Sequence, residues 1–262
     1  MSALANLGHR VLGTRQINQL IRFVPVLEAL RALPPGRLLD VGSGSTGIAP
    51  LLPRGWTVTA LDADFADYGA AVTAKGHSQR VLGDVRRLPF ADRQFDVVVA
   101  VDLLEHVSPD GRVAAIDELC RVARHRAIVA CPTGEAALTA DRNIKTSLLA
   151  RGAAVPAWLD EHLDNGFPER TELAAQAARH GAVDVAGNES ASAHERVTLA
   201  ELRLVSAVPL RIAARTLAPA LRRTSFPGPL AAKVVRRLGG HDREPTYRSV
   251  VCVDVEPRHN TE

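Results

Sequence analysis

The fold is decided by the stretch Leu38-Leu39-Asp40-Val41-Gly42-Ser43-Gly44-Ser45-Thr46-Gly47. A short apolar run that contains an acid leads directly into a turn with three glycines. Glycine permits sharp backbone bends and lets a ligand lie against main-chain atoms. In open α/β sheets, ligands bind at the carboxyl ends of the strands. We therefore expect a strand, a ligand-binding turn and a helix, in this order.

Strand and helix patterns alternate around this stretch through the first 131 residues. A helix over Gln16–Leu33, which contains Pro25, precedes it. The expected strands are Arg37–Val41, Trp56–Leu61, Ser78–Leu82, Phe95–Val101, Arg126–Cys131, Ala182–Ala186 and Ser249–Val255. The expected helices that follow are Ile48–Leu52, Phe65–Lys75, Gly111–Ala123 and Thr171–His180, the last with Thr171 as its N-cap. The alternation predicts an α/β fold with a Rossmann-like, doubly wound, mostly parallel seven-stranded sheet and a helical insertion near the C-terminus.

The composition is typical of a globular chain. Of the 262 residues, 46% are hydrophobic and 23% are charged, which suits one α/β domain with room for an insertion. The three cysteines, Cys120, Cys131 and Cys252, form no Cys-x-x-Cys pair, and we expect reduced, buried thiols. The sequence has neither a signal-peptide pattern at its start nor an apolar run of membrane-spanning length. We expect a cytoplasmic protein.

The net charge of +3 argues against a general nucleic-acid binder, but the charge is uneven. Residues 199–241 hold eight Arg and Lys against one Glu, a net +7, which leaves −4 for the rest of the chain. Within this segment one helical face would hold Leu210, Ala213, Ala214, Leu217 and Leu221, and another Arg211, Arg215 and Arg222. The segment can be a cap over the acceptor site, a contact with an anionic membrane, a site for an anionic substrate or only a structural insertion. We favour the cap among the functional interpretations.

Three acids end the first three strands. Asp40 would repel a pyrophosphate, but it suits a ligand that carries an ammonium and a sulfonium. Asp62 follows 22 residues later, where its carboxylate can accept hydrogen bonds from both ribose hydroxyls. Asp84, in Gly83-Asp84-Val85, is placed to accept from an adenine amino group, or it only forms a turn. The glycine spacing alone also fits a dinucleotide site.

The run LPFADRQFDVVVAVDLLEHV over Leu88–Val107, taken with the glycine stretch and Gly83-Asp84-Val85, resembles the class I S-adenosylmethionine-dependent methyltransferases of the type 11 branch. The resemblance covers Arg37–Cys131 and implies S-adenosylmethionine as the cofactor. It implies that the methionine part is held by Asp40, Gly42, Ser43 and Gly44, the ribose by Asp62 and the backbone of Ala63, and the adenine by Asp84 and the backbone of Val85. Asp102 would lie near the methionyl end. The chain has Thr46 where the family often has glycine, which leaves the detailed shape of the loop open.

Methyl transfer is an in-line displacement that needs an aligned acceptor and the exclusion of water. An oxygen or carbon acceptor usually also loses a proton, so we expect a general base only if the acceptor is of this kind. The candidates are His106, which follows the fourth strand, and His162, which precedes the helix that leads to the sixth strand. His106 alternatively caps a helix or orients Asp102. No spacing of His, Cys and Asp predicts a metal site.

The predicted organisation has an N-terminal helical segment (1–35), a cofactor-binding core (36–198), a basic helical insertion (199–245) and the final strand with its tail (246–262). The predicted function is methyl transfer from S-adenosylmethionine to a small-molecule, glycan or lipid-linked acceptor, with no nucleic-acid partner and with membrane contact through 199–241 as a minority interpretation. A non-catalytic S-adenosylmethionine-binding or regulatory protein is an open alternative. A short-chain oxidoreductase is less favoured, because Tyr68 and Tyr247 are not followed by lysine four places later. The acceptor atom and the oligomeric state are left open.

Overall fold

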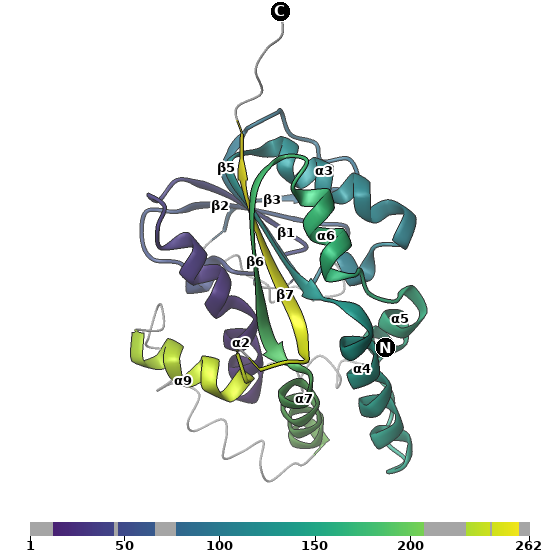
Figure 1. Cartoon of the computed structure of the whole chain (residues 1–262). Coiled ribbons are helices and arrows are strands. Elements are labelled where there is room, and N and C mark those ends of the chain that lie inside the picture. The colour runs from purple at the N-terminus through teal and green to yellow at the C-terminus, as the bar shows by residue number, and fades with distance from the viewer. Residues whose placement is uncertain (1–12, 45–46, 66–76, 207–228, 242, 257–262) are drawn as a thin grey trace, which may run out of the picture.

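The computed structural model describes residues 13–44, 47–65, 77–206, 229–241 and 243–256. A seven-stranded sheet with the order β3-β2-β1-β4-β5-β7-β6 forms its centre (Figure 1). The strands are β1 (Arg37–Val41), β2 (Thr57–Asp62), β3 (His77–Leu82), β4 (Phe95–Val101), β5 (Ala123–Pro132), β6 (Gly181–Ser190) and β7 (Thr246–Val255). The strands β3, β2, β1, β4 and β5 pair in parallel, whereas β7 is antiparallel to both β5 and β6. The predicted Rossmann-like, mostly parallel sheet is confirmed.

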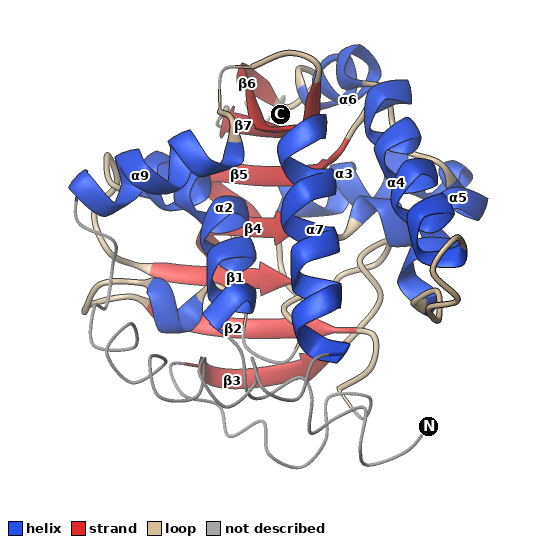
Figure 2. Cartoon of the chain, turned by 90° about the horizontal axis from the view of Figure 1, so that it is seen from below, coloured by secondary structure: helices blue, strands red, loops and turns tan. Residues whose placement is uncertain are grey.

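Helices cover both faces of this sheet. They are α2 (Gly13–Leu30), α3 (Arg112–Val122), α4 (Gly134–Leu149), α5 (Ala157–Asn165), α6 (Arg170–Ala177), α7 (Ala191–Ser206) and α9 (Pro229–Gly239), with the short 3-10 helices η1 (Ala49–Leu51), η3 (Leu104–His106) and η4 (Pro109–Gly111). Figure 2 looks onto the face that α2, α7 and α9 cover, and α7 lies across the carboxyl ends of the parallel strands. Helix α7 therefore covers that end of the sheet.

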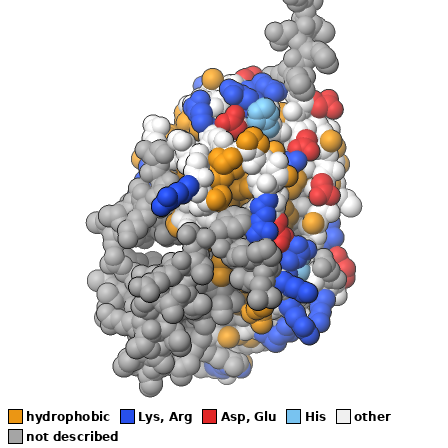
Figure 3. Space-filling view, turned by 90° about the vertical axis from the view of Figure 1, so that its left-hand side faces the viewer, with side chains coloured by type: hydrophobic (Ala, Val, Ile, Leu, Met, Phe, Trp, Pro, Cys, Tyr) orange, Lys and Arg blue, Asp and Glu red, His pale blue; other side chains and the backbone are white. Residues whose placement is uncertain are grey.

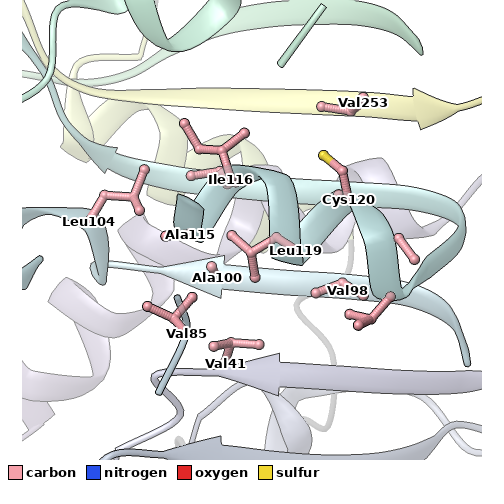
Figure 4. Packing of buried hydrophobic residues seen from close by; sticks show 14 of the residues in the cluster. Val41, Val85, Val98, Ala100, Leu104, Ala115, Ile116, Leu119, Cys120 and Val253 are labelled. Carbon is pink, nitrogen blue, oxygen red and sulfur yellow. The ribbon is translucent and has the colours of Figure 1, made fainter. Parts of the chain in front are cut away.

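The hydrophobic core lies in two layers, one on each side of the sheet. On one side, α3 packs against β4 and β5 and α6 against β6 and β7, and Figure 4 shows Ile116 and Leu119 of α3 above Ala100 and Val98 of β4. On the other side, α2 packs Val26 and Leu27 against the same strands. Strand β4 is apolar nearly throughout because both of its faces are buried.

Several elements differ from their sequence prediction. The helices α4 and α5 were not predicted, because the buried face of α4 contains small alanines and an acid, Asp141, which weaken the hydrophobic periodicity. Strand β6 extends four residues beyond Ala186, and its last three residues are buried but polar. The helix α6 begins at Arg170 with Glu169 as its N-cap, so the prediction of Thr171 as N-cap is wrong. Arg170 is the first residue of this helix, and its Nε donates a hydrogen bond of 2.9 Å to the Ser249 hydroxyl of β7.

The predicted division of the chain meets a continuous helix at its second boundary, between residues 198 and 199. Residue 199 lies inside α7, which runs from the core into the predicted insertion. At the far end of that insertion, Ala232 and Val235 of α9 pack against α2. The helix predicted over Phe65–Lys75 lies almost wholly outside the described residues, as do the predicted apolar and basic helical faces of the segment 207–228. The division stays a prediction.

The surface shown in Figure 3 carries, in its described part, basic and acidic side chains beside hydrophobic ones. None of the described helices is both long and apolar enough to cross a membrane. The three cysteines are free, with Cys120 and Cys131 buried and Cys252 half-buried.

Candidate functional site

A cavity of about 480 Å³ opens at the carboxyl ends of β1 and β4, below α7. Its wall is built by the glycine turn after β1, by the end of β4 with η3, and by residues of α2, α5, α7 and β7. Of the predicted site residues, it brings together Gly42, Ser43, Gly44, Asp102, His106 and His162. The volume suits a small molecule, since such sites commonly measure about 300–1,000 Å³.

The glycine turn has a backbone that only glycine adopts readily. Gly42, Gly44 and Gly47 have φ values of +69°, +56° and +51°. A Cβ atom on Gly47 would overlap the Asp40 carboxylate, and one on Gly42 would lie 2.9 Å from Leu103. The Ser43 hydroxyl in the same turn is buried and has no hydrogen-bond partner among the described residues. The turn therefore presents close main-chain atoms and one free hydroxyl to a ligand.

Asp40 lies behind the glycine turn and does not line the cavity. Its side chain is buried, and Oδ2 accepts a hydrogen bond of 2.8 Å from the Ile48 N–H. Burial raises the pKa of Asp40 to about 7, although the bond from Ile48 opposes this shift. The carboxyl group thus ties the two ends of the turn together.

Asp62 closes the turn from the neighbouring strand. Its Oδ2 accepts a hydrogen bond of 2.8 Å from the Gly44 N–H, and its Oδ1 accepts one of 3.3 Å from Asp64. The side chain is half-buried, and Ala63 beside it is exposed. Asp62 and Ala63 lie beyond the cavity wall, at the end of β2.

Asp84 pairs with a neighbour in its own loop. Its carboxylate lies 2.6 Å from Nη2 of Arg86, and hydrogen bonds from Arg86 lower the pKa of Asp84. The side chain is about half exposed, whereas Val85 packs in the core. The contacts of Asp84 are those of a turn, which was the alternative to adenine binding, and both interpretations stay predictions.

Asp102 lies at the centre of a buried charge network that the sequence did not predict. It has a left-handed backbone with φ +52° at the end of β4. Its Oδ1 accepts a hydrogen bond of 2.7 Å from Nε of Arg248, and Arg22 of α2 lies 2.9 Å from Oδ2. Burial alone would raise the pKa of Asp102, but the charges of Arg248 and Arg22 lower it to about 2. Arg248, which is 1% exposed, also bonds buried Glu189 at 2.5 Å.

A second buried group links α4, α5, α7 and β7. Asp141 accepts hydrogen bonds from the Tyr247 hydroxyl at 3.1 Å and lies 2.9 Å from Nδ1 of His162. His194 stacks on the Tyr247 ring and lies between Asp141, at 3.5 Å, and Glu189, at 3.4 Å. Burial lowers the pKa of His194, but the two carboxylates outweigh it, so the net shift is upward. The two networks therefore meet at His194 and Glu189.

The two predicted histidines face each other at one end of the cavity, with ring centres 5.1 Å apart. His106 is partly exposed, and its Nδ1 lies 3.0 Å from Oε2 of Glu161. His162 is buried. Between these residues in space lies Glu105, which is 1% exposed and has no hydrogen-bond partner for either carboxylate oxygen among the described residues.

Sequence reasoning missed Arg22, Glu105, Glu189, His194 and Arg248. Only Arg248 had a signal in the sequence, because this charged residue directly precedes the apolar run Ser249–Val255. Glu105 belongs to the run Leu88–Val107, in which nothing distinguishes it from the neighbouring residues. The remaining residues come from helices or strand ends whose neighbours are set by the tertiary fold.

Comparisons with known proteins agree with this geometry. A family model described as a methyltransferase domain matches residues 39–131. The demethylmenaquinone methyltransferase of Mycolicibacterium vanbaalenii is 30% identical over 169 residues, which are 60% of this chain and 73% of that enzyme. The enzyme of the same name from Beutenbergia cavernae is 38% identical over 104 residues, 37% of this chain and only 40% of the relative's length.

Solved structures share the fold at low identity. A protein of Anabaena variabilis, assigned as a methyltransferase from an antibiotic biosynthesis pathway, has a TM-score of 0.53 at 17% identity and covers 88% of this chain and 96% of that one. The [4+2]-cyclase SpnF has a TM-score of 0.54 at 16% identity and covers 90% of this chain and 81% of that one. Similarity at this level concerns the fold alone.

Proposed function

The chain belongs to the class I S-adenosylmethionine-dependent methyltransferases, and from this premise we propose that it transfers the methyl group of S-adenosylmethionine to a small-molecule acceptor. The observation that carries the proposal is the cavity, which joins the glycine turn to a space bordered by two histidines. One wall offers main-chain atoms and a free hydroxyl, and the other offers groups that can take up a proton. Both reactants would therefore meet inside one enclosure.

The residues present fit the cofactor. The unpartnered Ser43 hydroxyl and the left-handed glycines offer a close-fitting surface for the methionine part, together with Gly42 and Gly44. Asp40 does not contact the methionine part itself but holds the shape of the glycine turn through its bond to the Ile48 N–H. Asp62 and the backbone of Ala63 would hold the ribose, and Asp84 with the backbone of Val85 the adenine. When bound, the cofactor supplies a methyl group activated by its sulfonium.

The amino-acid end of the cofactor carries an ammonium and a carboxylate. Asp102 and Arg22 both line the cavity and lie 2.9 Å apart, so one acid and one guanidinium are available side by side. We assign Asp102 to the ammonium and Arg22 to the carboxylate. Arg248 keeps Asp102 ionised and fixes its position from the buried side.

At the acceptor end, the histidines orient the acceptor and can take its proton. The Nδ1 atoms of His106 and His162 lie against the carboxylates of Glu161 and Asp141, which leaves each Nε2 for the cavity. His106 is partly exposed, so a proton that it accepts can pass to water. Such general base catalysis typically contributes about 10²–10⁴ in rate.

The curated relatives are named demethylmenaquinone methyltransferases, and they support a small organic molecule as the acceptor class. A quinol is accordingly the first probe for the acceptor site. Glycan and lipid-linked acceptors, and contact of residues 199–241 with a membrane, stay predictions that the same screen tests with soluble sugars and with anionic vesicles.

The test begins with calorimetric titration by S-adenosylmethionine and, separately, NADH. We expect S-adenosylmethionine to bind to the native protein, and Asp62→Ala to lose this binding because it removes both the ribose acceptor and the bond to Gly44. Glu172→Ala, which changes an exposed acid on α6, is the matched control and should bind normally. Release of S-adenosylhomocysteine with each candidate acceptor then reports turnover. Binding of NADH alone would refute the proposal.

A further inference from the structure

We propose that Glu105, His106 and His162 form a binding site for one divalent transition-metal cation at the acceptor end of the cavity. Each residue offers one ligand atom, and the three atoms lie within 4.8 Å of one another. All three residues line the cavity. The set combines η3, which follows β4, with α5, which lies more than 50 residues later in the chain. The sequence predicted no metal site because the fold alone brings α5 against η3.

Glu105 is the first observation that points to a cation. Its carboxylate is almost completely buried, and neither oxygen has a partner among the described residues. Burying a carboxylate without a hydrogen bond or counter-charge is strongly unfavourable. The arginines around it are engaged elsewhere, because Arg248 bonds Asp102 and Glu189, and Arg112 donates to backbone carbonyl groups. A cation in the cavity would supply the missing partner.

The two histidines are the second, independent observation. A metal-bound histidine almost always gives its other ring nitrogen to a carboxylate or carbonyl, which fixes the tautomer and the ring orientation. Here Nδ1 of His106 lies 3.0 Å from Glu161, and Nδ1 of His162 lies 2.9 Å from Asp141. If each Nδ1 donates its hydrogen to the neighbouring carboxylate, Nε2 is the nitrogen of each ring that would bind the cation. The two rings lie next to each other, tilted by 56° with their centres 5.1 Å apart, so one ligand atom from each ring can approach the same ion.

The ligand set indicates the class of cation. Two imidazole nitrogens and one carboxylate oxygen suit zinc and its neighbours, with bonds of about 2.0–2.2 Å and further positions open to water or substrate. Magnesium prefers oxygen ligands and is not expected. Bonds of this length require the three ligand atoms to approach slightly, and the partly exposed His106 side chain can make that movement.

The role of the cation in catalysis rests on the proposed function, because it requires an acceptor bound in the cavity. A divalent cation next to the acceptor would bind an acceptor oxygen and lower the pKa of its hydroxyl group. With the cation bound, each Nε2 is a ligand, so His106 and His162 would position the acceptor through the cation, and water in the cavity, rather than a histidine, would take the acceptor's proton. The favoured acceptor is therefore one that offers a hydroxyl or enol oxygen.

The experiment titrates Co²⁺ into the full-length protein and follows its visible ligand-field absorption, with Zn²⁺ as competitor and Mg²⁺ as a non-binding probe. We expect one equivalent to bind and Zn²⁺ to displace it. His106→Ala and Glu105→Gln should weaken binding by at least about 10–100-fold, and Glu161→Gln, which only removes support from His106, by about 10-fold. His125→Ala is the matched control, because His125 is exposed and lies outside the cavity, and should bind normally. Circular dichroism confirms that each variant is folded.

Two results would overturn the cation site: no stoichiometric Co²⁺ absorption in the native protein, or an equal affinity in Glu105→Gln and His106→Ala. Calorimetry with S-adenosylmethionine on the same preparations separates this failure from that of the proposed function. A protein that binds S-adenosylmethionine but no cation refutes only the metal site. A protein that binds the cation in these three residues but transfers no methyl group refutes only the methyltransfer proposal.

Discussion

Replacing Arg248 by methionine should destabilise the protein more than any exposed charge substitution. Arg248 is fully buried and bonds two carboxylates, those of Asp102 and Glu189. Methionine has a similar length but no charge, so the variant leaves both acids buried without the guanidinium that bonds them, with Arg22 still beside Asp102 and His194 still beside Glu189. Breaking a buried ion pair on one side destabilises by about 3–5 kcal/mol. We expect a loss in this range from the free energy of unfolding at pH 7.

The effect should also depend on pH with a defined sign. In the native protein the pKa of Asp102 is held at about 2, below its ordinary 3.8, so Asp102 contributes about 2 kcal/mol of stability that is present above pH 4 and lost as the pH falls toward 2. In Arg248→Met the pKa of the same carboxyl group rises. At low pH this group is protonated, and the variant then no longer buries an uncompensated charge. The stability difference between the two proteins should therefore shrink from pH 7 to pH 4.

Urea denaturation at pH 7 and pH 4 measures both effects. Arg142→Met is the matched control, because Arg142 is about half exposed and its pair with Glu135 lies on the surface, where such pairs contribute about 0–1 kcal/mol. Glu189→Gln in the Arg248→Met background should recover part of the loss, since it removes one uncompensated charge. The reasoning would be refuted if Arg248→Met lost no more stability than Arg142→Met at either pH.

Three further outcomes follow from the site. Gly47→Ala should abolish S-adenosylmethionine binding in calorimetry, because its Cβ overlaps Asp40, whereas Gly152→Ala, with the same left-handed backbone (φ +62°) but open space around it, should show only backbone strain. The native protein should lose up to about 4 kcal/mol of stability between pH 4 and pH 7, because the pKa of Asp40 is raised from 3.8 to about 7 and the folded state favours the protonated carboxyl. Asp40→Asn should remove this loss in denaturation curves, and a parallel pH profile in both proteins would contradict it. Tyr247→Phe should lower the free energy of unfolding by about 1.5–3 kcal/mol, because it removes the bond to the buried Asp141 carboxylate, and a neutral effect in a thermal melt would contradict that role.

The fold could be predicted well where the sequence pattern is local. The strands β1, β2, β4 and β5 each contain an apolar run, and β4 matches its predicted bounds because a strand buried on both faces must be apolar along nearly its whole length. Prediction failed for α4 and for the end of β6, where most of the buried residues are alanines or polar groups. Such residues are stabilised by partners that lie far away in the sequence, so they leave no hydrophobic periodicity.

The site was predicted in part for the same reason. The glycine turn is encoded locally, since left-handed backbone and close packing both require glycine, and the predicted Gly42, Ser43 and Gly44 do line the cavity. The positions of the acids were harder to predict. A strand-end acid can line the cavity, as Asp102 does, or pair within its own loop, as Asp84 does with Arg86. The sequence of the loop does not distinguish these outcomes.

By itself the sequence determined the order of the seven strands along the chain, the glycine turn and the family, because each of these depends on residues close together in the chain. Only the tertiary structure decided which distant side chains share the cavity. It placed Arg248 of the last strand against Asp102 and laid α7 across the carboxyl ends of the parallel strands. It also brought His162 of α5 to Glu105 and His106. The physical reason is that a buried charge must find its partner in space, and the packing of helices on the sheet, which no local pattern specifies, determines where that partner lies.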